Sequence, residues 1–105
     1  MTPDDPILAR CRAVLQSLYG TRFKGLIPYG SAARGTDTPE SDIDLLVLLD
    51  GDVNGPAEVR RIGDELYPVQ LECDRAISIM PVEATGYQRG ESNLYQNVLE
   101  EGVPI

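Results

Sequence analysis

Histidine is absent from this 105-residue sequence, and its absence excludes histidine-based acid–base catalysis and His-rich zinc sites. Cysteine occurs only at Cys11 and Cys73, without the CxxC spacing of a redox or metal-binding motif. We therefore expect two buried thiols in a protein of the reducing cytoplasm. No apolar run approaches the roughly 18 residues that a membrane-spanning helix needs, so we expect no membrane association.

Positive charge is also scarce, because nine Lys and Arg residues stand against 17 Asp and Glu residues and leave a net charge of −8 at pH 7. This charge repels nucleic-acid backbones and anionic membranes, and it disfavours direct binding to either. It fits a basic protein partner, or metal ions that neutralise acidic clusters. The length allows one small domain with one hydrophobic core, and we expect residues 1–105 to form it.

The spacing of apolar residues predicts the order of secondary-structure elements. A recurrence every three to four positions predicts amphipathic helices at 5–19 and 56–73, and Pro68 should kink or split the second helix. Residues 42–49 are almost continuously apolar, which predicts a strand at the centre of a sheet. The other expected elements are a strand at 26–29, a short helical piece at 31–34, a polar loop at 36–41, a strand at 77–82, a loop at 83–91 and a last helix at 94–101. Pro81 in the strand at 77–82 prefers an edge or a strand-end position.

One group of residues has a spacing that indicates chemistry. Gly30 and Ser31 are followed, after ten intervening residues, by Asp42 and Asp44. Gly30 allows the backbone to approach a phosphate closely, and Ser31 at the start of a helical turn offers its hydroxyl and amide donors. Asp42 and Asp44 are two residues apart on an expected strand, so both carboxylates project from the same face and can share a cation.

The ligand chemistry of this group indicates Mg²⁺ or Mn²⁺, because carboxylate oxygens without imidazole or thiolate select these ions over zinc. A nucleoside triphosphate would complete the metal's shell with its own oxygens, and Arg34 lies where it could reach the same phosphates. The alternative is structural: Gly30 and Ser31 form a simple turn, and the two aspartates begin a strand at the solvent edge. Two like charges on an apolar strand favour the metal site, because they are costly without a counter-ion.

The stretch around these residues, which includes Ala33-Arg34-Gly35 and Ser41-Asp42, resembles the minimal nucleotidyltransferases of the DNA polymerase beta superfamily. The motif of that family is Gly-Ser, ten residues and then Asp-x-Asp. The resemblance covers nearly the whole chain and implies a single, complete domain of the α/β (α+β) class, a small mixed β-sheet flanked by helices.

The resemblance also implies the roles of the residues. Gly30, Ser31, Arg34 and Ser41 are expected to bind the nucleotide, and Asp42 and Asp44 are expected to be catalytic and to bind Mg²⁺ with ATP as the substrate. The nucleotidyl group would pass to a hydroxyl while pyrophosphate leaves.

One position departs from the family pattern. Fully active members carry a third carboxylate on the next strand, where this sequence has Ser78. A serine supplies no negative charge and cannot act as a base near neutral pH. Asp74 has the strand parity of Ser78 but precedes the expected strand, and we expect Glu72 and Glu83 to be solvated surface acids. The third ligand therefore stays unassigned.

Minimal nucleotidyltransferases of this length resemble the MntA-type antitoxins of two-gene toxin–antitoxin modules. The expected partner is then a small helical HEPN ribonuclease toxin, which the antitoxin adenylylates with ATP in a possible hetero-oligomer. The alternative is a weak or inactive antitoxin that neutralises its partner by binding, and the missing third carboxylate favours this alternative. A third hypothesis, an antibiotic-modifying enzyme, usually requires an additional helical domain.

Overall fold

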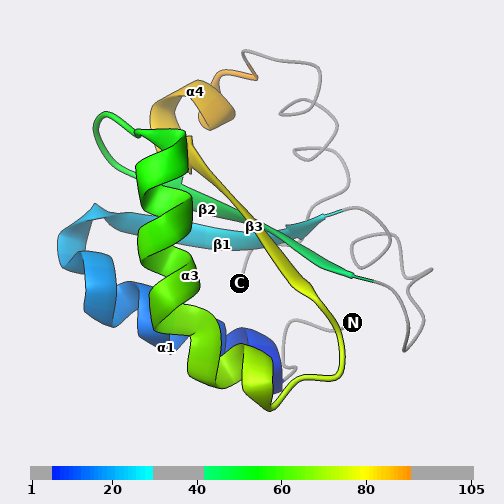
Figure 1. Cartoon of the computed structure of the whole chain (residues 1–105). Coiled ribbons are helices and arrows are strands. Elements are labelled where there is room, and N and C mark those ends of the chain that lie inside the picture. The colour runs from blue at the N-terminus through cyan, green and yellow to red at the C-terminus, as the bar shows by residue number, and fades with distance from the viewer. Residues whose placement is uncertain (1–5, 30–41, 91–105) are drawn as a thin grey trace.

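The computed structural model of the chain describes residues 6–29 and 42–90 (Figure 1). In chain order its elements are α1 (Pro6–Tyr19), a short 3-10 turn (Gly20–Arg22), β1 (Phe23–Tyr29), β2 (Ile43–Leu49), α3 (Gly55–Leu71), β3 (Ile77–Glu83) and α4 (Ala84–Gln88). The first expected helix and all three expected strands are confirmed. The helical pieces expected at 31–34 and 94–101 and the loop expected at 36–41 lie outside the described residues.

The three strands form one mixed sheet in the order β1-β2-β3. β1 pairs with β2 antiparallel, and β2 pairs with β3 parallel. The expected mixed sheet is therefore confirmed, with β2 in its centre and β3 at its edge. The register places Tyr29 of β1 opposite Asp44 of β2, and Ser78 of β3 on the other side of Asp44.

α1 and α3 cover one face of the sheet, which we call the helix face (Figure 1). The odd-numbered residues of β2 point to this face because side chains alternate along a strand. They pack on apolar residues that recur along the two helices, and the resulting core cluster is Leu8, Cys11, Leu15, Tyr19, Phe23, Leu26, Ile43, Leu45, Val47, Leu49, Ile62, Leu66 and Val69. Nearly every strand position on this face is thus used for packing.

The opposite face carries a smaller apolar cluster, formed by Ile27, Leu46, Leu48, Val82, Ala84 and Tyr87. The last two of these residues belong to α4, which contacts β2 and β3. Asp44 has the same strand parity as Leu46 and Leu48, so it belongs to this face. We call this second face of the sheet the site face.

Two sequence-based expectations require correction. Pro68 does not split α3, which runs without interruption from Gly55 to Leu71. A proline removes the hydrogen bond to the carbonyl four residues earlier, here that of Asp64, and both residues are exposed, so water can satisfy that carbonyl. The expected loop at 83–91 is wrong, because residues 84–88 form α4, in which Ala84 and Tyr87 are buried.

A buried carboxylate fastens the start of α3 to the β1–β2 end of the sheet. Glu58 is 5% exposed and accepts a hydrogen bond from the Tyr19 hydroxyl at 3.1 Å. Arg22 approaches the same carboxylate at 3.5 Å and also donates to the carbonyls of Asp50 and Asp52, at 3.0 and 2.9 Å. Burial, followed by the charge of Glu58, raises the pKa of Tyr19 to about 12. Sequence reasoning did not find this network, because its members are far apart in the chain.

Both cysteines are free thiols, of which Cys11 is buried and Cys73 half-buried. Within residues 6–29 and 42–90, no helix is long and apolar enough to cross a membrane.

Candidate active site

Asp42 and Asp44 lie where the chain enters the central strand. Asp42 immediately precedes β2 and is exposed, whereas Asp44 is its second residue and is half-buried. The Ile43 N–H between them donates to the Ala76 carbonyl at 2.8 Å. This hydrogen bond holds the start of β2 against the residue that precedes β3. The two expected catalytic residues are therefore held by the sheet and not by a free loop.

Two electrostatic effects act on the Asp44 carboxyl. Partial burial, and after it the negative charge of Asp42, raise the pKa of the Asp44 carboxyl. Each cause disfavours the ionised form, and a bound cation would reverse the second one. Two carboxylates without a nearby imidazole or thiolate are the donor set of Mg²⁺ or Mn²⁺. The residues present therefore fit a divalent cation that takes the rest of its ligands from water or phosphate.

The row of the sheet through Asp44 is polar from edge to edge. Tyr29 is half-buried on one side of Asp44, and Ser78 is exposed on the other. Burial, followed by the charge of Asp44, raises the pKa of the Tyr29 hydroxyl, which brings Tyr29 into the electrostatic environment of the site. Tyr29 is not among the site residues expected from the sequence. Its position directly before Gly30, at the end of a strand that pairs with β2, was the signal that could have found it.

The structure supports the assignment of Ser78 to the position next to Asp44, because the two residues are partners in the parallel ladder. Asp74, Glu72 and Glu83 are all exposed, and Glu72 forms an ion pair with Arg10. Among the described residues, no third Asp, Glu, Cys or His joins the aspartate pair in a group able to hold a metal ion. The described part of the site thus offers two carboxylates.

The expected nucleotide-binding residues Gly30, Ser31, Arg34 and Ser41 lie outside the described residues. The described residues on either side of them are Tyr29, the last residue of β1, and Asp42, which immediately precedes β2.

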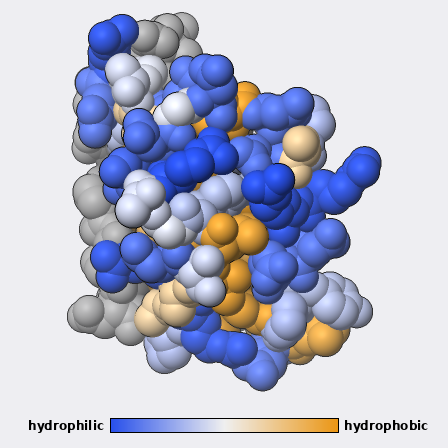
Figure 2. Space-filling model, turned by 90° about the vertical axis from the view of Figure 1, so that its left-hand side faces the viewer, coloured by the Kyte–Doolittle hydropathy of each residue, from blue (hydrophilic) through white to orange (hydrophobic). Residues whose placement is uncertain are grey.

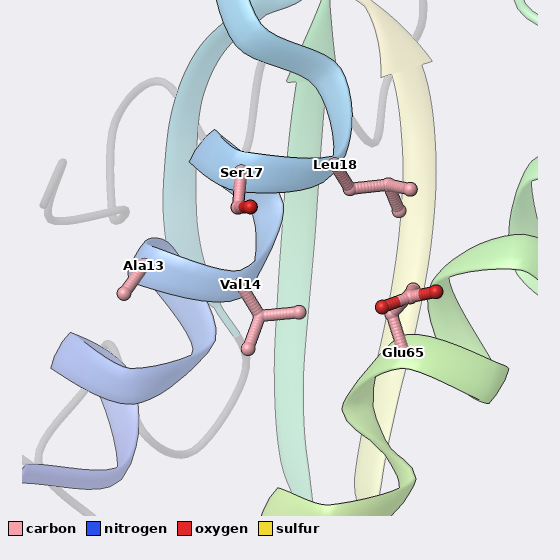
Figure 3. Close-up of a pocket in the computed structure, with 5 residues that line it drawn as sticks. All are labelled: Ala13, Val14, Ser17, Leu18 and Glu65. Atoms are coloured by element: carbon pink, nitrogen blue, oxygen red, sulfur yellow. The ribbon is translucent and has the colours of Figure 1, made fainter.

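A hollow among the described residues lies away from this site. It measures about 470 Å³ and lies between α1 and α3, where Val14 and Leu18 turn toward Glu65 (Figure 3). Figure 2 shows the side of the molecule that is on the left in Figure 1, where an apolar streak runs between hydrophilic side chains. Because α1 and α3 cover the helix face and Asp44 belongs to the site face, this hollow cannot hold a ligand of the aspartates.

The sequence matches the family model of the nucleotidyltransferase domain over residues 8–101. The chain therefore belongs to the nucleotidyltransferase domain family, and its class is that of a transferase. This result confirms the family and the enzyme class that the Gly-Ser and Asp-x-Asp spacing indicated.

A curated relative and two solved structures are similar to the chain. The relative, from Methanocaldococcus jannaschii, has the name "Putative protein adenylyltransferase MJ0604" and is 34% identical over 89 residues, which cover 84% of this chain and 83% of the relative. A crystal structure of a mutant toxin–antitoxin MntA–HpeT matches with a TM-score of 0.63 at 19% identity, over 92% of this chain and 69% of that chain. A toxin–antitoxin structure with AMP-PNP matches with a TM-score of 0.61 at 20% identity, over 90% and 69%. These structures confirm the fold.

Proposed function

We propose that this chain is a Mg²⁺-dependent adenylyltransferase that transfers AMP from ATP to a hydroxyl of a partner protein. The observation that carries the proposal is the Asp42–Asp44 pair at the start of the central strand, where partial burial, and after it the charge of Asp42, raise the pKa of Asp44. The name of the relative, a protein adenylyltransferase, supports this choice of reaction.

The proposed reaction is an in-line displacement at the α-phosphorus of ATP. The oxygen of the acceptor hydroxyl forms the new P–O bond, the bond to the bridging oxygen of the β-phosphate breaks, pyrophosphate leaves and the hydroxyl proton passes to solvent. Bound Mg²⁺ would supply Lewis-acid stabilisation of charge on the phosphate oxygens. The roles of the chain itself are to hold the cation through Asp42 and Asp44 and to receive the phosphates at Gly30, Ser31, Arg34 and Ser41.

The proposed acceptor is the toxin of a toxin–antitoxin pair, a small helical ribonuclease of the HEPN type. The two solved structures described above are toxin–antitoxin structures, which supports a toxin as partner, and one of them contains AMP-PNP, which supports ATP as the substrate. The net charge of −8 fits a basic partner. In this proposal the chain is the antitoxin, and modification inactivates the partner.

The test is to incubate the chain with α-labelled ATP, Mg²⁺ and lysate of its own source and to look for labelled protein. The expected result is one labelled small protein, which disappears with Asp44→Asn and persists with the control Asp64→Asn. Asp64 is an exposed aspartate on α3, the helix that covers the opposite face. Labelling that survives Asp44→Asn would contradict the proposal.

A second candidate function is neutralisation by binding alone. The observation in its favour is Ser78, which occupies the position beside Asp44 without a carboxylate. In this alternative the antitoxin retains the nucleotide site as a sensor or a relic, and turnover is slow or absent.

The Asp42→Asn, Asp44→Asn double variant separates the two functions. If AMP transfer is the function, the variant loses both labelling and protection of cells that express the toxin. If binding is the function, the variant keeps protection. Ser78→Asp adds the missing carboxylate, and the matched neutral variant Ser78→Asn does not. Labelling that increases with Ser78→Asp alone would identify position 78 as the cause of slow turnover.

A further inference from the structure

The outer edge of β3 is open within the described part of the chain. The Ile43 N–H donates to the Ala76 carbonyl, and a parallel ladder uses alternate residues of each strand. The backbone groups of even-numbered β3 residues therefore face β2, and those of the odd-numbered residues face outward. An added strand would have to pair with these outward groups.

Two features limit the part of that edge that is open to pairing to a short stretch between Ile77 and Pro81, which we call the window. The outward N–H of Ile77 already donates to Gln70 Oε1 at 2.8 Å, and Gln70 Nε2 donates to the Arg75 carbonyl at 2.9 Å. Pro81 has no N–H to offer. Ile79 lies between these two positions. Its N–H can donate to, and its carbonyl can accept from, one residue of an antiparallel segment.

A small hollow lies on the helix face of this same window. It measures about 130 Å³ and is lined by Gly63, Leu66, Tyr67, Gln70, Ile77 and Ile79. Beside it on α3, Tyr67 is 61% exposed and Leu71 is 68% exposed, which is unusual for large apolar side chains. The residue of an added strand that pairs with Ile79 would point its side chain into this hollow, because paired residues share a face.

The next residue of such a strand would point to the opposite face, toward the aspartates. Ser78 lies between Ile77 and Ile79, faces the site and is the ladder neighbour of Asp44. Neighbouring strands are about 4.8 Å apart, so a residue opposite Ser78 would have its backbone roughly 10 Å from that of Asp44. A tyrosine side chain spans such a distance far better than serine or threonine.

We propose that the edge of β3 receives an extended segment of the acceptor protein, whose apolar side chain enters the hollow at Ile79 and whose adjacent tyrosine lies beside Ser78, facing Asp44. This inference rests on the proposed function, and it names the form in which the acceptor hydroxyl is presented. The charge of −8 favours a segment with flanking Lys or Arg. The window admits one pairing residue, so the recognised motif is short.

The test uses the synthetic peptide acetyl-Lys-Ser-Leu-Tyr-Ser-Lys-amide, in which leucine is the residue that pairs with Ile79 and the tyrosine after it lies opposite Ser78 in an antiparallel pair. Binding is measured by fluorescence anisotropy with a labelled version that has Phe in place of Tyr, so that no transfer is needed. N-methylation of the leucine should weaken binding about five- to tenfold, the effect of one lost hydrogen bond and its steric block. N-methylation of the preceding serine, whose N–H points away, should not.

The matched protein variants fill the hollow or leave it open. Gly63→Leu should weaken binding by a similar factor, and the control Gly55→Leu should not. No atom lies within 4 Å of a Cβ added at either glycine, so both variants should fold. Absent binding, or binding insensitive to both Gly63→Leu and the leucine N-methyl group, would overturn the proposal. A dimer of the chain that Gly63→Leu dissociates would overturn it in favour of a second copy at this edge.

The proposed function fails separately from this inference. If the Phe peptide binds as expected and the Tyr peptide is not labelled by α-labelled ATP, adenylyl transfer is contradicted and the docking edge stands. If the Tyr peptide is labelled with a KM that neither modification changes, transfer stands and the docking edge is contradicted.

Discussion

The two faces of the sheet differ in what their side chains do, although the same three strands build both. On the helix face, Leu45 is fully buried under α1 and α3, like its neighbours along β2. On the site face, β2 begins with the half-buried carboxylate of Asp44. The apolar cluster of that face starts two residues further along the strand, at Leu46. Of two adjacent residues of one strand, Leu45 thus packs in the core and Asp44 is a carboxylate of the candidate site.

The difference shows how a small domain keeps a costly charge pair. The helix face buries most of the apolar core, so the domain can accept two like-charged aspartates at the open end of the other face. If this account is correct, substitutions on the helix face reduce stability, whereas substitutions of the Asp44 row reduce binding and transfer. The following predictions test that division.

The largest expected effect is the loss of transfer in Asp44→Asn, which removes one of the two carboxylates that hold the cation. We expect a reduction of about a thousandfold in labelling rate, which corresponds to about 4 kcal/mol. Quantitative α-labelled ATP assays against the purified partner measure it, and a reduction below tenfold would show that Asp44 is not a metal ligand.

Next in size is the stability loss of Leu45→Ala, one residue from Asp44 and on the opposite face. Removal of a fully buried leucine side chain from this core should cost about 3 kcal/mol. Urea unfolding followed by circular dichroism measures it. Asp44→Ala is the matched control and should cost nothing, so equal losses in the two variants would contradict the division between the faces.

The sequence predicted the fold where local patterns were strong. The periodicity of α1 and the apolar run of β2 sufficed, and Pro81 correctly indicated an edge position for β3. α4 was missed because Thr85 and Gly86 are weak helix formers, and burial of Ala84 and Tyr87 against β2 and β3 overrides that preference.

The candidate site was predictable only in part. The Asp42–Asp44 pair follows from spacing, because a strand has a fixed period of two. Ser78 was expected beside the pair only through the family resemblance, and Tyr29 was missed, because no local pattern specifies the register between strands. The network of Glu58 is likewise a product of tertiary packing.

A smaller effect is expected at Glu58, which stabilises the helix face from its rim. Glu58→Gln retains an acceptor for the Tyr19 hydroxyl but removes the charge that faces Arg22. We expect a loss of about 1–2 kcal/mol in the free energy of unfolding. Glu65→Gln, at an exposed position of the same helix, is the control and should leave the urea midpoint unchanged.

The smallest effect is a pH dependence from Asp44. Its pKa is raised in the folded chain, so the folded state holds this proton more tightly than the unfolded state does. The free energy of unfolding should therefore fall as the pH rises from the ordinary aspartate range through the raised pKa. Asp44→Asn should remove this decline and be slightly more stable than the native chain above that pH. Thermal unfolding from pH 3 to pH 7 measures the difference, and an Asp44→Asn variant that is less stable at pH 7 would contradict the assigned cause.

The most direct test of the account is Mn²⁺ binding in the presence of a non-hydrolysable ATP analogue, followed by electron paramagnetic resonance. The account predicts that the native chain and Leu46→Val bind Mn²⁺ with the analogue, whereas Asp44→Asn remains folded and loses this binding. Equal Mn²⁺ binding by the native chain and Asp44→Asn would contradict the assignment of the site face as the centre of the chemistry.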